Sequence, residues 1–229
     1  MSAVDPITAA HPVLWNMALI HRILRRSFSE LAHLVTDVPD DDAARTAAVA
    51  NHLRFTLDGL SAHHTTEDDL VWPVLLARAR PSTTLIERME EQHRGLHTTI
   101  DEICRLADIW RATPSHDAAS DLSAAITAML GQLTTHLDEE ERDVVPLIAE
   151  HLTLAEWDQV GETAFDKFTP AQRFTALGQL LEVASPAEAA AMLATLPAPI
   201  KLLWRLIGKR RYRRYTQAFR GTPAASGRS

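Results

Sequence analysis

Three pairs of side chains in this 229-residue chain have the spacing that metal ligands on a helix need. The members of each pair lie four residues apart: His63 and Glu67, His93 and His97, and His136 and Glu140. Residues four apart share one face of an α-helix, so each pair can offer two donor atoms to one cation from the same side. Imidazole and carboxylate donors suit iron, manganese or zinc, and the donor types alone do not choose among these metals.

Two of these pairs lie in matching copies of one sequence pattern. Residues 63–75 read HHTTEDDLVWPVL and residues 136–148 read HLDEEERDVVPLI, so that a His, a Glu, a Val and a Pro coincide. A weaker match aligns IHR at 20–22 with QHR at 92–94. The repeat predicts two copies of a helical hairpin packed about a pseudo-twofold axis. That arrangement would bring ligands from four helices to one depth in the core.

His21 adds a fifth imidazole, because it falls on the apolar stripe of the first expected helix, beside Leu24 and Phe28. Since a carboxylate can bridge two cations through its two oxygens, five imidazoles and two carboxylates suit two metals rather than one. For two octahedral ions, this set and a shared oxide or hydroxide leave about one coordination position open for a small ligand. The alternative without metal would bury two carboxylates and several imidazoles with no cation, which is costly.

The elements that must position these ligands are helices. Apolar residues recur at helical spacing through most of the chain, and alternating strand-like runs are absent. Four long helices with short connections are expected near residues 12–35, 43–79, 82–111 and 117–151. This pattern predicts an all-α fold, an antiparallel up-down four-helix bundle, in which Pro73 and Pro146 reshape the second and fourth helices just after the ligands.

The predicted bundle occupies residues 10–151, and two further regions follow it. A C-terminal helical extension is expected over residues 152–220, with helices near 153–166, 170–183 and 186–195 and a longer basic amphipathic helix over 199–219. The expected helix starts carry capping signals, at Thr153 with Glu156, at Thr169-Pro170, and at Ser185 with Glu188. Residues 221–229 are expected to form a disordered tail.

The combined ligand pattern resembles the hemerythrin-like, HHE cation-binding family over about residues 10–151. The resemblance is carried by His21, HHTTE at 63–67, HRGLH at 93–97 and HLDEE at 136–140. It implies a centre of two iron ions, rather than manganese or zinc, with a bridging oxo or hydroxo group inside a four-helix bundle. It also implies ligand roles: His21 and His63 for one iron, His93, His97 and His136 for the other, and Glu67 and Glu140 as bridges.

One position departs from the family pattern. Oxygen-carrying hemerythrins place an Asp five residues after the last ligand His, where this chain has Glu141. Whether Glu140 or Glu141 bridges therefore stays open at this stage, and the inference to simple oxygen carriage is weakened.

The expected function follows from the open coordination position. A buried diiron centre of this kind suits diatomic-sized ligands or hydrogen peroxide, so we expect peroxide or nitric oxide removal in a redox stress response, supported by a reductant that the sequence does not identify. The alternative is reversible oxygen binding or storage, or sensing of oxygen, nitric oxide or iron without turnover. The sequence leaves open whether the protein is an enzyme, and no catalytic residue is expected beyond the metal centre.

Composition places the chain among ordinary globular proteins. It is 46% hydrophobic and 23% charged, which excludes collagen-like, disordered and disulfide-scaffold classes. No window of 18 uncharged apolar residues and no signal-peptide pattern is found, and the one cysteine, Cys104, is typical of a reducing compartment. A cytoplasmic location is therefore expected.

The charge is unevenly distributed, because residues 196–229 contain no Asp or Glu and many Lys and Arg, although the net charge is −7. This basic segment could lie on an anionic membrane surface, contact nucleic acid, or pack on the acidic bundle within one chain or across a dimer. We favour packing on the bundle and do not expect nucleic acid binding.

The other histidines are not expected to bind metal. His64 is expected to neighbour the site rather than to ligate. Solvated positions are expected for the remaining histidines: His11, His33, His52, His116 and His151.

Overall fold

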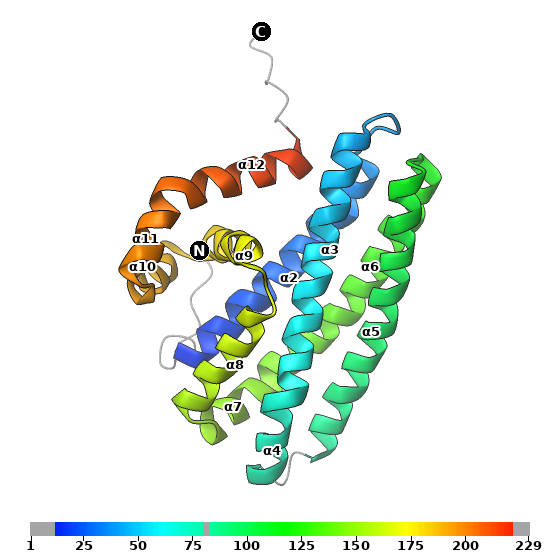
Figure 1. The fold of residues 1–229 in the computed structure, drawn as a ribbon. Coiled ribbons are helices and arrows are strands. Elements are labelled where there is room, and N and C mark those ends of the chain that lie inside the picture. The colour runs from blue at the N-terminus through cyan, green and yellow to red at the C-terminus, as the bar shows by residue number, and fades with distance from the viewer. Residues whose placement is uncertain (1–11, 80–82, 222–229) are drawn as a thin grey trace.

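The computed structural model describes residues 12–79 and 83–221, and every regular element in them is a helix (Figure 1). Four rods form the bundle, and two of them consist of three consecutive segments. The rods are α2 (Pro12–Thr36); α3 (Ala43–Thr66), η1 (Glu67–Val71) and α4 (Trp72–Arg78); α5 (Thr83–Ala112); and α6 (His116–Glu139), η3 (Glu140–Val144) and α7 (Val145–His151). The predicted all-α four-helix bundle is confirmed. The start expected for the third helix, at residue 82, lies outside the described residues.

The core of the bundle consists of two apolar clusters with a polar layer between them. The larger cluster includes Phe28 and Leu133, and the smaller one includes Met17 and Trp72. Along α2, for example, His21 falls between Met17 of the smaller cluster and Leu24 of the larger one. The polar layer is therefore closed above and below by packed hydrocarbon, which keeps bulk water away from it.

The segments η1 and η3 are π-helical turns at matching positions of the sequence repeat. The backbone N–H of Trp72 donates to the carbonyl of Glu67, and the N–H of Val145 donates to the carbonyl of Glu140, five residues earlier in each case. A proline is the second residue after each turn. Proline lacks an N–H and clashes with the carbonyl four residues before it. The wider turn relieves that clash. The expected reshaping at Pro73 and Pro146 is confirmed.

The C-terminal extension lies against the α2–α3 side of the bundle, with α5 and α6 on the far side (Figure 1). Its helices are α8 (Leu154–Asp166), α9 (Pro170–Val183), α10 (Pro186–Thr195), α11 (Ala198–Leu203), η4 (Trp204–Gly208) and α12 (Lys209–Arg220). Capping boxes begin α8, α9 and α10 at Thr153, Thr169 and Ser185, as their sequences predict. The single long helix expected over 199–219 is instead interrupted by a third π-helical turn.

The basic segment packs on the bundle through one face of α12. Arg220 forms ion pairs with Glu30 of α2 and Glu182 of α9, at 2.5 and 2.9 Å. Phe219 is buried between the extension and the bundle. The favoured interpretation, packing on the bundle, therefore describes this face of α12, and the contacts lie within one chain. The predicted disordered tail falls almost wholly on residues 222–229, outside the described residues.

His52 corrects the solvated position expected for it. Its side chain is buried in α3, bonded to the Tyr215 hydroxyl at 2.7 Å and stacked on Phe219 at 3.9 Å between ring centroids. The extension covers it, so its burial depends on residues more than 160 positions later. Of the other four histidines, His33 and His116 are exposed, His151 is half-buried, and His11 lies outside the described residues.

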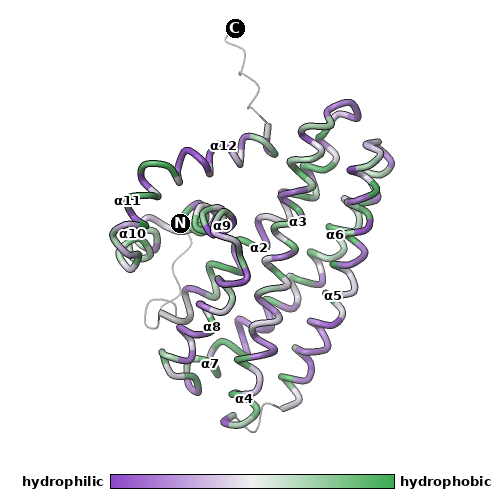
Figure 2. The backbone as a smooth tube through the Cα atoms, viewed as in Figure 1, coloured by the Kyte–Doolittle hydropathy of each residue, from purple (hydrophilic) through white to green (hydrophobic). Residues whose placement is uncertain are grey.

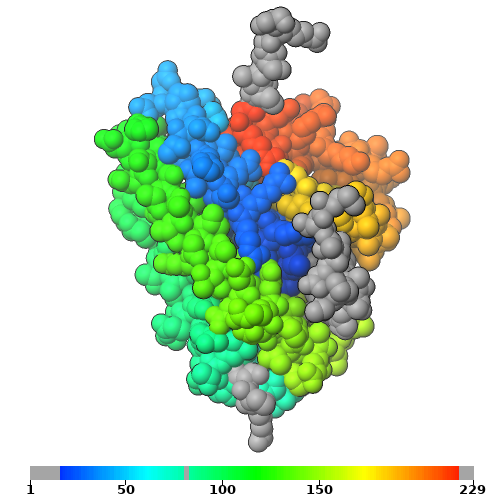
Figure 3. All heavy atoms as spheres, turned by 180° about the vertical axis from the view of Figure 1, so that it is seen from behind, coloured from blue at the N-terminus to red at the C-terminus, as the bar shows by residue number. Residues whose placement is uncertain are grey.

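None of the helices that the structure describes has both the length and the apolar composition needed to cross a membrane. Figure 3 shows the bundle from the opposite side, with the end of the extension against one flank of it.

Candidate metal centre

Titratable side chains from all four rods meet in the polar layer of the bundle. His21 comes from α2, His63 and His64 from the end of α3, His93 from α5 and His136 from the end of α6. Glu67 and Glu140 are the first residues of the two π-helical turns. All seven side chains are buried, and His63 is the most exposed of them at 8%.

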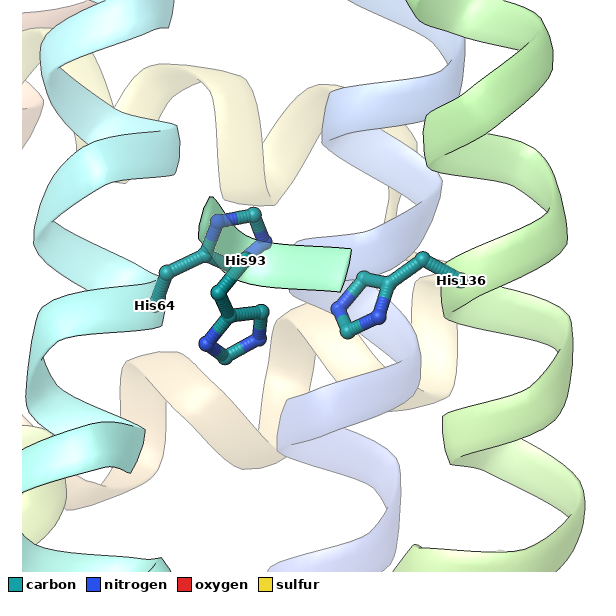
Figure 4. A group of neighbouring side chains, drawn as sticks. All are labelled: His64, His93 and His136. Carbon is teal, nitrogen blue, oxygen red and sulfur yellow. The ribbon is translucent and has the colours of Figure 1, made fainter. Parts of the chain in front are cut away.

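These residues form two groups that could each hold a metal ion. His21, His63 and Glu140 place one ligand atom each within 4.8 Å of one another, and so do His64, His93 and His136. Figure 4 shows the second group, whose side chains point toward one another from different helices. Two neighbouring sets of buried nitrogen and oxygen donors match the binuclear arrangement expected from the sequence.

Each carboxylate lies between a histidine of one group and a histidine of the other. Glu140 Oε2 is 3.3 Å from His21 Nε2 and 3.7 Å from His136 Nε2. Glu67 turns Oε1 toward His63 Nδ1 at 3.3 Å and Oε2 toward His93 Nε2 at 3.7 Å. These placements suit carboxylates that bridge two cations.

Three of the histidines are oriented by hydrogen bonds on the side away from the centre. The Nδ1 atoms of His21, His93 and His136 bond to Glu141 at 2.8 Å, Asp68 at 2.7 Å and Gln92 at 2.8 Å, respectively. A partner at Nδ1 fixes the ring orientation and leaves Nε2 free to coordinate, which is the usual outer support of metal-bound histidine.

The Nε2 atoms of His21 and His63 lie within hydrogen-bond distance of each other, at 3.2 Å. The other eight inward-facing atoms of the site have no hydrogen-bond partner within the described part of the chain. They are both carboxylate oxygens of Glu67 and Glu140, Nε2 of His93 and His136, and both ring nitrogens of His64. Leaving a buried acceptor unpaired costs about 1–3 kcal/mol, and more for a charged group. Metal ions would satisfy these atoms, so the residues present fit a metal centre.

The protonation states expected for these buried groups in the metal-free chain also favour metal binding. Burial lowers the pKa of His63 to about 3 and that of His136 to about 4, so both rings are neutral at neutral pH, the form that binds metal. Burial and then the neighbouring Glu140 raise the pKa of Glu67 well above its usual value. Burial would raise the pKa of Glu140, but the His21 ring, whose Nε2 is 3.3 Å from Glu140 Oε2, outweighs burial and lowers that pKa. A cation between the two carboxylates would let both ionise.

The second group contains His64, which the sequence places beside the site, and does not contain His97, which the family resemblance predicts as a ligand. His97 is half-buried and belongs to neither group; its ring centroid is 6.1 Å from that of His64. The His64 ring stacks on that of His93, with centroids 4.0 Å apart. His64 is therefore a candidate ligand that sequence reasoning missed, and ligation by His97 stays a prediction.

Glu140 and Glu141, which the sequence leaves as alternatives, face different surroundings. Glu140 is fully buried among the histidines. Glu141 lies outside both groups, where it accepts hydrogen bonds from His21 Nδ1 and from Arg25 at 2.7 Å. This geometry suits Glu140 as a bridging carboxylate and Glu141 as a group that supports the His21 ring from behind.

Two cavities between the bundle and the extension reach the centre on its His63 side. One is about 170 Å³ in volume and is lined mainly by apolar side chains, Phe55 and Phe165 among them. The other is about 290 Å³ and is lined by Glu67 and Trp157, among others. His63 lines both cavities, so a small ligand can approach the site past this histidine.

A four-helix bundle with a paired His/Glu site in its core defines a class of binuclear cation-binding proteins. The sequence matches the hemerythrin HHE cation binding domain over residues 13–148, and the chain belongs to this family. No curated protein and no solved structure matches the chain. The family match therefore covers the bundle up to residue 148, and the C-terminal extension is not matched in these comparisons.

Proposed function

We propose that this chain holds a non-haem diiron centre that binds a small uncharged ligand and consumes peroxide or nitric oxide. The observation that carries the proposal is the position of Glu67 and Glu140, each between two histidines of different groups with both oxygens unpaired. Imidazole and carboxylate donors are compatible with iron, and membership of the hemerythrin family is the reason to prefer iron over manganese or zinc.

The residues of the chain have distinct roles in this proposal. His21, His63, His64, His93 and His136 would hold the two ions, and Glu67 and Glu140 would bridge them. When bound, the two irons supply an electron-transfer couple and an open position for the ligand. The outer partners Asp68, Gln92 and Glu141 keep the coordinating rings in place.

The surroundings of the centre favour small uncharged ligands. The apolar clusters on both sides exclude bulk water, and the route past His63 is lined mainly by hydrocarbon. A charged ligand would lose its hydration along that route with no compensating group. Oxygen, nitric oxide and hydrogen peroxide carry no charge and avoid this cost.

Elemental analysis and turnover assays test the proposal together. Protein produced with ample iron is expected to contain two irons per chain and to consume hydrogen peroxide or nitric oxide when a reductant is supplied. His63→Ala should lose metal and turnover, whereas His33→Ala, which changes an exposed histidine of α2, should keep both. Metal content near zero, or one weakly held zinc, would contradict the diiron centre. A stable oxygen adduct without turnover would replace consumption by reversible binding.

A further inference from the structure

The outward side of α11, η4 and the start of α12 combines exposed aliphatic and cationic side chains. Leu202, Leu206 and Ile207 are 57%, 68% and 56% exposed, and Ile200 and Leu203 are each 38% exposed. Large apolar side chains that gather at one place on a surface indicate an interaction site. Figure 2 shows hydrophobic residues about α11 giving way to hydrophilic residues along α12.

The cations of this segment are unpaired, which is unusual in a chain with excess acidic residues. Arg205, Lys209, Arg210, Arg211, Arg213 and Arg214 form no ion pair with any residue that the structure describes. By contrast, Arg220 on the inward side is paired with two carboxylates. A group of the exposed residues, Leu206, Ile207, Arg210, Arg211 and Arg214, lines a shallow surface hollow.

The opposite side of the same helices is fixed to the protein. Trp204 and Phe219 are buried, and the Tyr212 hydroxyl donates a hydrogen bond to Glu182 of α9. At Gly178 of α9 an added Cβ would overlap the Tyr212 ring, so the two helices are in close contact. The aliphatic and cationic side chains are therefore presented outward by a docked helix.

We propose that this outward face, residues 200–214, binds an anionic lipid bilayer. Aliphatic side chains would enter the boundary of the acyl region, and arginine and lysine would meet the headgroup phosphates, as in helices that lie in the plane of a membrane interface. The charge is complementary to such a surface: this stretch contains seven Lys and Arg residues and no Asp or Glu. The proposal does not depend on the metal centre, which lies in the bundle core.

The composition of the face favours a bilayer over other anionic or apolar partners. Nucleic acid is bound through exposed aromatic rings on which bases stack, but here Trp204 is buried and Tyr212 and Tyr215 are turned inward. A symmetric contact between two copies would oppose one set of unpaired cations to another, which is unfavourable. Neither partner would use aliphatic and cationic side chains at the same time.

Vesicle sedimentation with the full metal-loaded chain tests the proposal. The protein is expected to bind vesicles of equal parts phosphatidylcholine and phosphatidylglycerol, and not vesicles of phosphatidylcholine alone. Replacing Arg210, Arg211 and Arg214 together by Gln should weaken binding by about 100-fold, since each cation near the surface contributes about fivefold. The double change Leu206→Ser and Ile207→Ser should weaken binding by at least about 10-fold.

Matched variants remote from the face serve as controls. Ile109→Ser and Arg105→Gln change an exposed aliphatic and an exposed cationic side chain of α5 and should leave vesicle binding unchanged. Far-UV circular dichroism and metal content of each variant establish that the fold is intact.

Three results would overturn the proposal. The first is equal binding to neutral and anionic vesicles, or binding to neither. The second is tighter binding to single- or double-stranded oligonucleotides than to anionic vesicles. The third is a dimer in sedimentation velocity that the Leu206→Ser, Ile207→Ser variant converts to monomer, because the aliphatic side chains would then be covered by a second copy.

Discussion

Replacing Gly178 by Ala tests how the extension is held on the bundle. Gly178 lies in the interior of α9 and is buried beneath the Tyr212 ring of α12. An added Cβ would fall 2.6 Å from Cε2 of that ring and closer still to Cδ2 and Cγ, where ordinary contacts begin at 3.4 Å. The tyrosine must therefore withdraw from α9, and its hydrogen bond to Glu182 is lost.

The expected cost can be worked out from these contacts. Overpacking costs about 1–3 kcal/mol, and loss of a hydrogen bond to a charged group costs about 1.5–3 kcal/mol. Alanine gains about 1 kcal/mol in helix propensity over glycine. The net effect is about 1.5–5 kcal/mol against docking of α12, which raises the population of the undocked state by at least about 10-fold.

Limited proteolysis measures this change directly, because α12 offers trypsin several arginines that must leave the helix before cleavage. Gly178→Ala should be cleaved within residues 209–214 at least about 10-fold faster than the wild type. Gly161→Ala in α8 is the matched control: its added Cβ meets nothing within 4 Å, so it should stabilise the protein by up to about 1 kcal/mol. Cleavage of Gly178→Ala at the wild-type rate would refute the contact between α9 and α12.

Three further predictions concern the centre and the buried His52. Glu140→Gln should lower the metal content to one ion per chain or fewer, whereas Glu141→Gln should weaken metal affinity by about 10–100-fold with unchanged stoichiometry at saturation; the reverse pattern in metal titrations would exchange their roles. Asp68→Asn should weaken metal retention against a chelator by about 10-fold, because a neutral amide supports His93 less well than a carboxylate; unchanged retention would contradict this role. Burial, and then Arg220, lowers the pKa of His52 from 6.5 to about 3, so its stabilising effect is complete above pH 6.5 and is lost as the pH falls toward 3. His52→Gln should therefore reduce the pH dependence of the free energy of unfolding in that window by up to about 1.4 kcal/mol per pH unit, measured by urea denaturation; an unchanged slope would exclude a buried neutral His52.

The parts of the structure that the sequence predicts are those encoded by local patterns. Helix bounds follow from apolar periodicity, proline positions and capping boxes such as Thr153 with Glu156, all of which act within a few residues. The repeat adds long-range information, because two copies of one hairpin can bury matching polar positions only by bringing them together. Both copies do place their glutamates, Glu67 and Glu140, at the centre of the core.

His64 shows where the repeat gives an incomplete answer. Its counterpart in the second copy is Leu137, and both side chains are fully buried. The repeat therefore indicates that this position faces the core, but a position that faces the core next to a metal site can hold either an apolar side chain or a ligand. Only the stacking of His64 on His93 distinguishes the two, and that contact joins different helices.

His52 shows a second limit, which is set by sequence separation. Nothing near it in α3 indicates burial, and its partners Tyr215 and Phe219 come from the last helix of the extension. The spacing of Tyr212, Tyr215 and Phe219 is the sequence signal for this contact. Three aromatic residues at helical intervals in a basic segment indicate a helix face that packs against another part of the protein. What it packs on is decided by the tertiary structure.

The three π-helical turns illustrate how one backbone geometry arises from different local causes. Two precede Pro73 and Pro146, and the repeat places both next to the ligand glutamates. No proline follows the third, where Lys209 N–H donates to the Trp204 carbonyl. There the Trp204 ring lies against Gly208, so closely that an added Cβ would overlap it. The first two π-helical turns place the carboxylates of Glu67 and Glu140 in the core. At the third π-helical turn, the Trp204 side chain points inward and the neighbouring aliphatic side chains face outward. Gly208 therefore permits the close approach of the Trp204 ring, and this role could be recognised only once that ring was placed.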